Sequence, residues 1–201
     1  MRTVSVTGHG EARVAPDSAV VRVSAVQRAA DVAEALAGAD SAATRVVTTG
    51  REHTTPERIG TTGLQIWPAH DDQGRRSGFE ARHSLTLRCT DIAAASGLLT
   101  ALAATVGDRL QVEGVSLEVA DRAAAERQAR EAAYADAVER AGHLAGLAGA
   151  RLGEPQDVVE GGLVSGLPRM AMPVAASLDA ASLEPGETSV TSSVTVTFQL
   201  L

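Results

Sequence analysis

Cys89 and His83 are the side chains in this sequence that come nearest to a nucleophile with its base. They share the apolar face of an alternating run, and a thiolate–histidine pair is a known nucleophilic arrangement. Six residues at a rise of ~3.3 Å each separate the two by about 20 Å along a strand, too far for a hydrogen bond. We therefore expect Cys89 to be a buried structural thiol and His83 to be a core or interface histidine.

Three further clusters contain chemically capable side chains. His70-Asp71-Asp72 carries ligand atoms, but it lies in a glycine-containing turn and no zinc or calcium spacing accompanies it. Ser165 is one residue out of register with a Gly-x-Ser-x-Gly nucleophile elbow. Gly8-His9-Gly10 lacks the third glycine of a dinucleotide fingerprint, since Arg13 stands there. We predict no catalytic, cofactor-binding or metal-binding residues, and His9, His53 and His143 have no partner at a useful spacing.

Composition excludes several classes of function. The chain has 18 arginines and no lysine, which removes the Walker A loop, pyridoxal-phosphate catalysis and the Ser-x-x-Lys hydrolases. A formal charge of -7 and an aromatic content of 2% argue against a nucleic-acid partner. The single cysteine cannot form an intramolecular disulfide. Residue 1 leads directly into a strand pattern and no apolar run approaches a membrane span of about 20 residues, so the sequence predicts a soluble, cytoplasmic protein.

Hydrophobic periodicity predicts an α+β fold. A first strand over residues 3–8 is expected to end at Gly8-His9-Gly10 and to pair, hairpin-like, with a second strand over 19–27. An antiparallel sheet of long strands packed by two or three Ala-rich helices should follow, with a strand-strand-helix rhythm in both halves of one domain, 1–201. The helices are expected at 31–50, 91–106 and 121–148. The other strands are expected at 63–68, 79–89, 115–119, 155–160 and 190–200. A polar turn is expected at 70–78 and an irregular segment at about 161–187.

The order of these motifs resembles the SIMPL-domain family, which includes bacterial periplasmic immunogenic proteins and has long been described as of unknown function. The resemblance rests on residues 4–17, on Ile66-Trp67-Pro68 before a turn ending Gly78-Phe79, on the Ala-rich helix over 129–148, and on 185–187 with the closing strand. Its motif residues here are Gly8, Gly10, Pro16, Asp17, Pro185 and Gly186. It implies an α+β fold, no established enzymatic activity, homo-oligomers that can be ring-like or channel-like, a link to stress responses, and a periplasmic or exported location if the start is truncated.

We predict a non-enzymatic, self-associating domain with a role in stress, in which the 161–187 segment and the final strand contribute to contacts between copies. The final strand is long and regular and has few charged residues, so it would be hazardous as an exposed edge. Met170 and Met172 suit an adaptable contact surface. One alternative is a small-ligand binding or sensing module with its pocket between sheet and helices, its ligand unknown. A less favoured alternative is an unrecognised hydrolase that uses scattered carboxylates or histidines.

Overall fold

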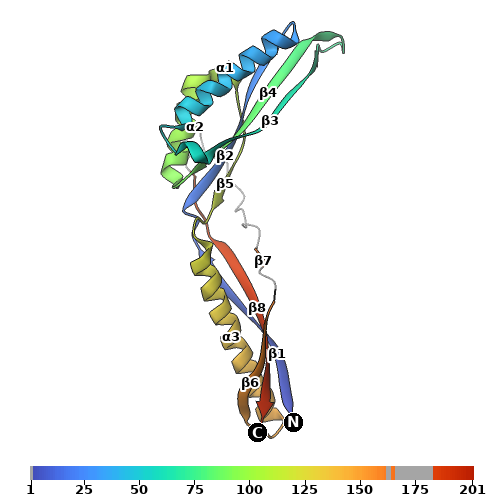
Figure 1. Ribbon diagram of the computed structural model, residues 1–201, viewed down its shortest axis with the longest axis vertical. Coiled ribbons are helices and arrows are strands. Elements are labelled where there is room, and N and C mark those ends of the chain that lie inside the picture. Colours follow the sequence, from blue (N-terminus) through green and yellow to red (C-terminus); the bar gives the residue numbers. More distant parts are fainter. Residues whose placement is uncertain (1, 162–163, 166–182) are drawn as a thin grey trace. The chain divides into compact units, whose positions relative to one another are not determined.

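A computed structural model describes residues 2–161, 164–165 and 183–201. These residues form three α-helices and two antiparallel sheets, which confirms the α+β class (Figure 1). They fall into two compact units. The central unit contains Pro16–Ala120 together with residues 183–185, and the terminal unit joins residues 2–15, 121–161, 164–165 and 186–201. Whether the two units behave as one domain, as predicted for 1–201, stays a prediction.

The terminal unit is one sheet with one helix against it. Its strands follow the order β1-β8-β6, and the short β7 also pairs with β8. Helix α3 packs on β1 and β8, and its alanines meet the valines and the phenylalanine of the sheet in an apolar core. The elements are β1 (Thr3–Val14), α3 (Arg122–Leu147), β6 (Leu152–Glu160), β7 (Val164–Ser165) and β8 (Thr188–Leu200).

Glycines in β1 allow α3 to lie unusually close to the strand. A Cβ added at Gly8 would lie 2.1 Å from the carbonyl oxygen of Ala133, and one at Gly10 would lie 2.0 Å from that of Ala129. The prediction that Gly8-His9-Gly10 ends the first strand is therefore wrong, because β1 continues through it to Val14. The two glycines instead let the backbone of α3 approach β1 closely, which is a known reason for a glycine inside a strand. The buried face of α3 is a row of alanines, one every fourth residue: Ala125, Ala129, Ala133, Ala137, Ala141 and Ala145.

The expected hairpin between the first two strands is also wrong. Strand β1 pairs with β8, from Thr3 opposite Gln199 to Val14 opposite Thr188, whereas β2 lies in the other sheet. Two alternating strands joined by a short connection have the same sequence pattern whether they pair with each other or lie in different sheets. The pattern therefore could not predict which strand pairs with β1. The final strand is likewise not an edge, since β8 has β1 on one side and β6 on the other.

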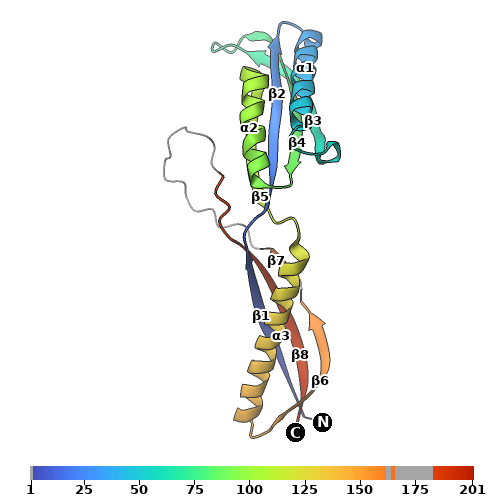
Figure 2. The same ribbon diagram turned by 90° about the vertical axis from the view of Figure 1, so that its left-hand side faces the viewer.

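The central unit is a second sheet, of strand order β3-β4-β2-β5, with two helices on one face. Figure 2 shows α1 and α2 on the face of the sheet that is turned toward the viewer, and no other helix of the described residues packs on this sheet. Asp31 and Asp91 cap the two helices by accepting hydrogen bonds from the amides of Glu34 and Ala94, at 2.9 and 2.6 Å. The elements are β2 (Ser18–Ala29), α1 (Val32–Gly50), β3 (Ile59–His70), β4 (Arg76–Cys89), α2 (Ile92–Val106) and β5 (Leu110–Glu118).

Strand β5 contains a bulge that the sequence pattern did not predict. Gly114 lies opposite Arg22 and Val112 opposite Val23, so Glu113 is the extra residue. The bulge shifts the alternation by one, and so Leu110 and Val115 both pack against the apolar core although five residues separate them. It also explains why the strand begins at Leu110, earlier than the predicted residue 115.

Candidate functional site

Cys89 and His83 have different surroundings in the structure and do not form a nucleophile–base pair. Cys89 is 1% exposed within the core of the central unit, and burial, followed by the nearby charge of Asp91, raises the pKa of its thiol. The imidazole of His83 is 16% exposed, lies 3.7 Å from the carboxylate of Asp40 on α1, and shares a 3.1 Å hydrogen bond with the Thr61 hydroxyl on β3. The thiol is protected and the histidine is held between sheet and helix, in agreement with the sequence interpretation.

The His70-Asp71-Asp72 cluster is a turn organised by one carboxylate. Asp71 accepts hydrogen bonds from the amides of Gln73 and Arg75, at 3.0 and 2.9 Å, and from the Arg75 guanidinium at 3.0 Å. The hydrogen bond from the Arg75 amide is the main reason why the pKa of Asp71 is lowered. Among the described residues, no three His, Cys, Asp or Glu side chains lie together as metal ligands would.

The remaining motif residues lie at connections between elements. The amide of Asp17 donates to the carbonyl of Glu118 at 3.1 Å, and the carboxylate of Asp17 accepts from the amide of Ala120 at 2.7 Å. Pro16 precedes it in the same connection. Gly186, which follows Pro185 shortly before β8, has a φ of 53°, a conformation that favours glycine. A structural role for these residues, and for Gly8 and Gly10, stays a prediction with which these contacts agree.

The other candidates do not form a site. The backbone amide of His9 donates to Asp136 on α3 at 2.8 Å, while His143 is exposed and His53 is half-buried beside Gly97. Ser165 lies in β7 opposite Val190, and the residues that follow it lie outside the described part of the chain. The predictions for Met170 and Met172 fall outside the described residues.

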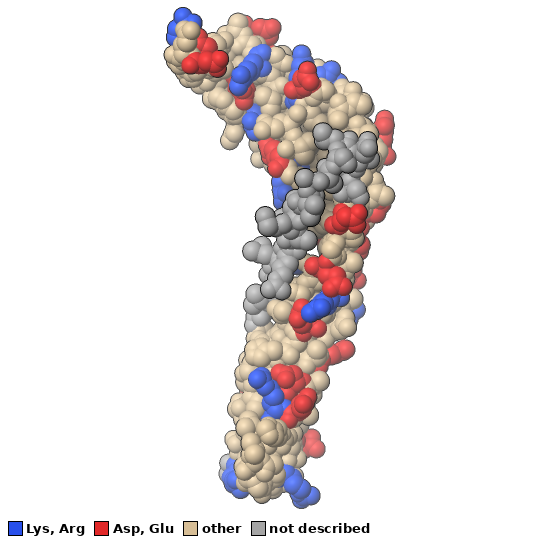
Figure 3. Space-filling view, turned by 180° about the vertical axis from the view of Figure 1, so that it is seen from behind, with Lys and Arg blue, Asp and Glu red and all other residues tan. Residues whose placement is uncertain are grey.

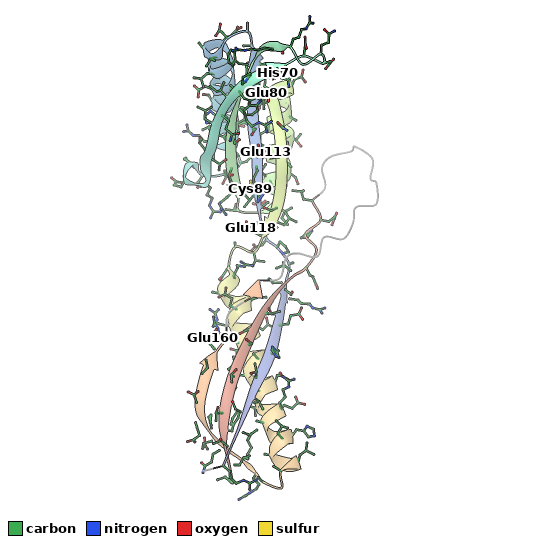
Figure 4. The ribbon with its side chains drawn as sticks, turned by 90° about the vertical axis from the view of Figure 1, so that its right-hand side faces the viewer. His70, Glu80, Cys89, Glu113, Glu118 and Glu160 are labelled. Atoms are coloured by element: carbon green, nitrogen blue, oxygen red, sulfur yellow. The ribbon has the colours of Figure 1, made fainter. Side chains whose placement is uncertain are left out.

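A polar groove lies on the helix-free face of the central sheet, which Figure 4 views with the helices behind it. Its volume is about 620 Å³, within the range of small-molecule sites. The expected pocket lay between sheet and helices, so the groove lies on the opposite face from that expectation. It is lined by Val26, Gln27, Arg28, Glu80, Arg82, Asp108, Arg109, Leu110 and Gln111.

Glu80 and Arg82 on β4 are the centre of a charge network in this groove. The Glu80 carboxylate, whose side chain is only 10% exposed, accepts a 2.6 Å hydrogen bond from Nε of Arg28. Nη2 of Arg82 lies 3.9 Å from Glu80, and its Nη1 lies 3.5 Å from the Glu113 carboxylate. The guanidinium of Arg82 also lies over the ring of Trp67, 5.6 Å from the ring centroid. The network holds the guanidinium of Arg82 in place.

The bulge in β5 brings Glu113 into this network. Its carboxylate accepts a hydrogen bond from the hydroxyl of Ser24, which is fully buried and also bonds the Ser84 hydroxyl at 2.8 Å. Because Ser24 has no exposed surface, it does not meet a substrate in this conformation. The groups that face solvent are guanidinium, carboxylate and amide groups, whose chemistry is the recognition of charged and hydrogen-bonding ligands.

Sequence reasoning found part of this site. The alternation over 79–89 places Glu80, Arg82 and Ser84 together on the polar face, as observed. It could not place Glu113 beside them, because a bulge changes which face a residue occupies without changing the sequence pattern. It could not find Arg109 either, since the turn before β5 is positioned by tertiary packing.

The fold and site define a protein of two antiparallel sheets, one backed by α3 and the other by α1 and α2, with a charged groove on the second. A sequence profile of the SIMPL family, described as "Protein of unknown function (DUF541)", matches residues 4–198, and the chain belongs to this family. The chain is 27% identical over 216 residues to the 26 kDa periplasmic immunogenic proteins of Brucella melitensis and Brucella abortus, covering 98% of this chain and 84% of each relative. None of the helices in the described part of the chain is long and apolar enough to cross a membrane.

Proposed function

We propose that the protein is a non-enzymatic domain that associates with further copies of itself through the open edge of β3. Strand β3 runs for 12 residues at the end of its sheet and pairs, among the described strands, with β4 alone. Leu64 and Ile66 on this strand are 50% and 36% exposed. An exposed edge strand with apolar side chains offers backbone hydrogen bonds and apolar area to another strand. This edge is the observation that supports the proposal.

The proposed contact surface is the edge of β3, and not the final strand and the 161–187 segment that the sequence predicted. The final strand cannot offer an edge, because β8 is paired on both sides. Of the 161–187 segment, Leu183 packs against the apolar core of the central unit, while most of the segment lies outside the described residues. Pro68 lies near the far end of β3, where a missing amide hydrogen limits strand addition.

Charge makes the proposed association dependent on salt. The net charge of -7 makes copies repel one another at low ionic strength, and screening shortens that repulsion to about 8 Å at physiological salt. On the face drawn in Figure 3, acidic and basic side chains are interspersed. We expect the fraction of oligomer to rise with salt.

Sedimentation velocity on the intact chain at tens of micromolar tests the proposal. The double variant Leu64→Lys, Ile66→Lys adds the charges that natural edge strands use against association, and it should shift the protein toward monomer. Leu147→Lys is the matched control, because Leu147 is 73% exposed at the end of α3 and belongs to the other unit. A monomeric intact chain at high and low salt, or equal loss of oligomer in both variants, would contradict the proposal.

The second candidate is a binding module, and the groove on the central sheet favours it. Its size and its exposed arginines suit a charged ligand. A thermal-shift screen with grouped small anions, cations and neutral metabolites tests this candidate directly. No rise in melting temperature with any group would count against it.

An exported location and a role in stress are also part of this proposal. The Brucella relatives are named as periplasmic, which supports the export alternative for this chain over the cytoplasmic expectation. Fractionation of cells that express the natural gene decides between the two. A role in stress is supported by the family resemblance only, and comparing survival of a deletion strain with its parent under oxidative and envelope stress tests it.

A further inference from the structure

Strand β2 lacks a neighbour along part of one side. Strand β4 pairs with it as far as Ala29, which lies opposite Phe79, but its pairing with β5 stops at Ala25 opposite Leu110. Among the described residues, no strand continues β5 beside residues 26–29. Four residues at ~3.3 Å each leave an open edge of about 13 Å, and the groove lies along it.

On this side the Val26 backbone has no strand partner among the described residues, and the Arg28 carbonyl is bonded only to a side chain that a partner strand would have to displace. The carbonyl of Ala29 faces β4, since a Cβ added at Gly78 would lie 2.3 Å from its oxygen. Because neighbouring residues in a strand direct their backbone groups to opposite sides, those of Val26 and Arg28 face the open side. The Arg28 carbonyl accepts a 2.5 Å hydrogen bond from the side-chain amide of Gln27, which takes the place a neighbouring strand would fill.

The charges around the open edge favour a partner with negatively charged side chains. Three arginines and two acidic residues line the groove of a chain whose net charge is -7. Arg28 and Arg82 already share the carboxylate of Glu80. The exposed side chains of Arg109 and Gln111 make no hydrogen bond or ion pair with the described residues, although Asp108 lies next to Arg109. Carboxylates are the groups that a free guanidinium binds best.

We infer that this groove binds a short extended peptide segment that carries carboxylate side chains, added as a strand beside residues 26–29 of β2. The inference rests on the second candidate function and names its ligand class. A row of backbone groups suits an extended peptide, which adds main-chain hydrogen bonds to a sheet edge and places alternate side chains in its pockets. Arg109 and Gln111 at the start of β5 bind the carboxylates.

Titration of the full-length chain with a labelled, end-blocked Glu-Val-Glu-Val peptide tests this inference by fluorescence anisotropy. The emission of Trp67, the single tryptophan, gives a label-free second readout because its ring packs on Arg82. We expect binding that weakens with salt, and a Kd that rises by about tenfold or more in Arg109→Glu, as for loss of a charge-assisted hydrogen bond. Arg45→Gln, an exposed arginine on α1 without a partner among the described residues, should change the Kd by less than about twofold.

Three comparison ligands separate strand addition from simple anion binding. A Lys-Val-Lys-Val peptide should bind more weakly, and so should the acidic peptide with N-methylated backbone amides, because it cannot donate to the strand edge. Succinate should bind more weakly than the acidic peptide. If succinate or the N-methylated peptide binds equally well, strand addition is overturned and the groove remains an anion site. If no peptide binds at millimolar concentration, or Arg109→Glu has no effect, the inference is also overturned.

Discussion

Burial of the Cys89 thiol makes the stability of the folded chain depend on pH. Cys89 lies between apolar side chains in the central core, so the folded chain holds its proton more tightly than the unfolded chain does. The protonated state is favoured on folding. Stability from this source is therefore fully present below the pKa of the unfolded thiol and is lost as the pH rises toward the higher pKa of the folded one.

We predict that the free energy of unfolding falls as the pH rises above about 8.5, the ordinary thiol pKa. The chain has no lysine, so few other groups titrate in this range. Urea denaturation between pH 7.5 and 9.5 measures the effect, and Cys89→Ala should lower stability at every pH while showing a flatter profile. A variant profile as steep as that of the parent would assign the pH dependence to other groups. Slow reaction of the native thiol with a disulfide reagent would agree with the burial.

How much the sequence could predict is also decided residue by residue. Both cap residues, Asp31 and Asp91, could be placed because a local hydrogen bond determines them. Gly8 and Gly10 were misinterpreted as a strand end, since the helix that requires them lies more than 100 residues later in the chain. Glu113 and Arg109 were missed for the same reason: a bulge and a turn fixed by distant packing leave little signal in their own neighbourhood.

Close contact between α3 and β1 is the main feature at the scale of elements. Every fourth residue of the helix is an alanine, and the strand opposite has glycine at two positions. Helix side chains also satisfy the outer edge of β1: Asp136 accepts from the His9 amide, and Arg140 donates to the Thr7 carbonyl at 2.6 Å. The helix therefore both packs on this edge strand and covers part of its backbone.

We predict that Gly10→Ala destabilises the terminal unit by about 2 kcal/mol or more, as overpacking does. The added methyl group would meet the backbone of α3, which cannot move aside as a flexible side chain can. Gly142→Ala is the matched control, because Gly142 lies in α3 with no atom within 4 Å of an added Cβ, and it should raise helix stability by about 0.5–1 kcal/mol. Urea denaturation followed by circular dichroism measures both. Equal effects in the two variants would contradict the close-packing argument.

At the scale of the whole molecule, each unit has a core of its own. The largest buried cluster, which contains Val21, Leu85 and Leu98, belongs to the central unit, and the clusters around Val196 and Ala129 belong to the terminal unit. The chain also carries one tryptophan and one tyrosine, and they divide between the units: Trp67 lies in β3 and Tyr134 in α3. Each unit thus has a spectroscopic reporter.

We predict that the two units unfold as separate transitions. Gly10→Ala should lower the urea midpoint of the Tyr134 signal and leave that of Trp67 fluorescence unchanged. Leu98→Ala, a fully buried residue of α2, should do the reverse and lower the Trp67 transition by about 2–5 kcal/mol. Coincident shifts of both signals in both variants would show one cooperative domain, as the sequence alone suggested.

The pairing of β1 with β8 has a consequence for how the chain is made. Thr3 lies opposite Gln199, so strand β1 must wait until β8, which is synthesised much later, is available before the two can pair. The central unit is nearly continuous over Pro16–Ala120 and can fold while synthesis proceeds. Until β8 has been synthesised, β1 lacks this partner and newly made neighbours can capture it. A stop codon placed just before β8 would therefore leave Pro16–Ala120 of the central unit intact and release a chain in which β1 lacks its partner strand.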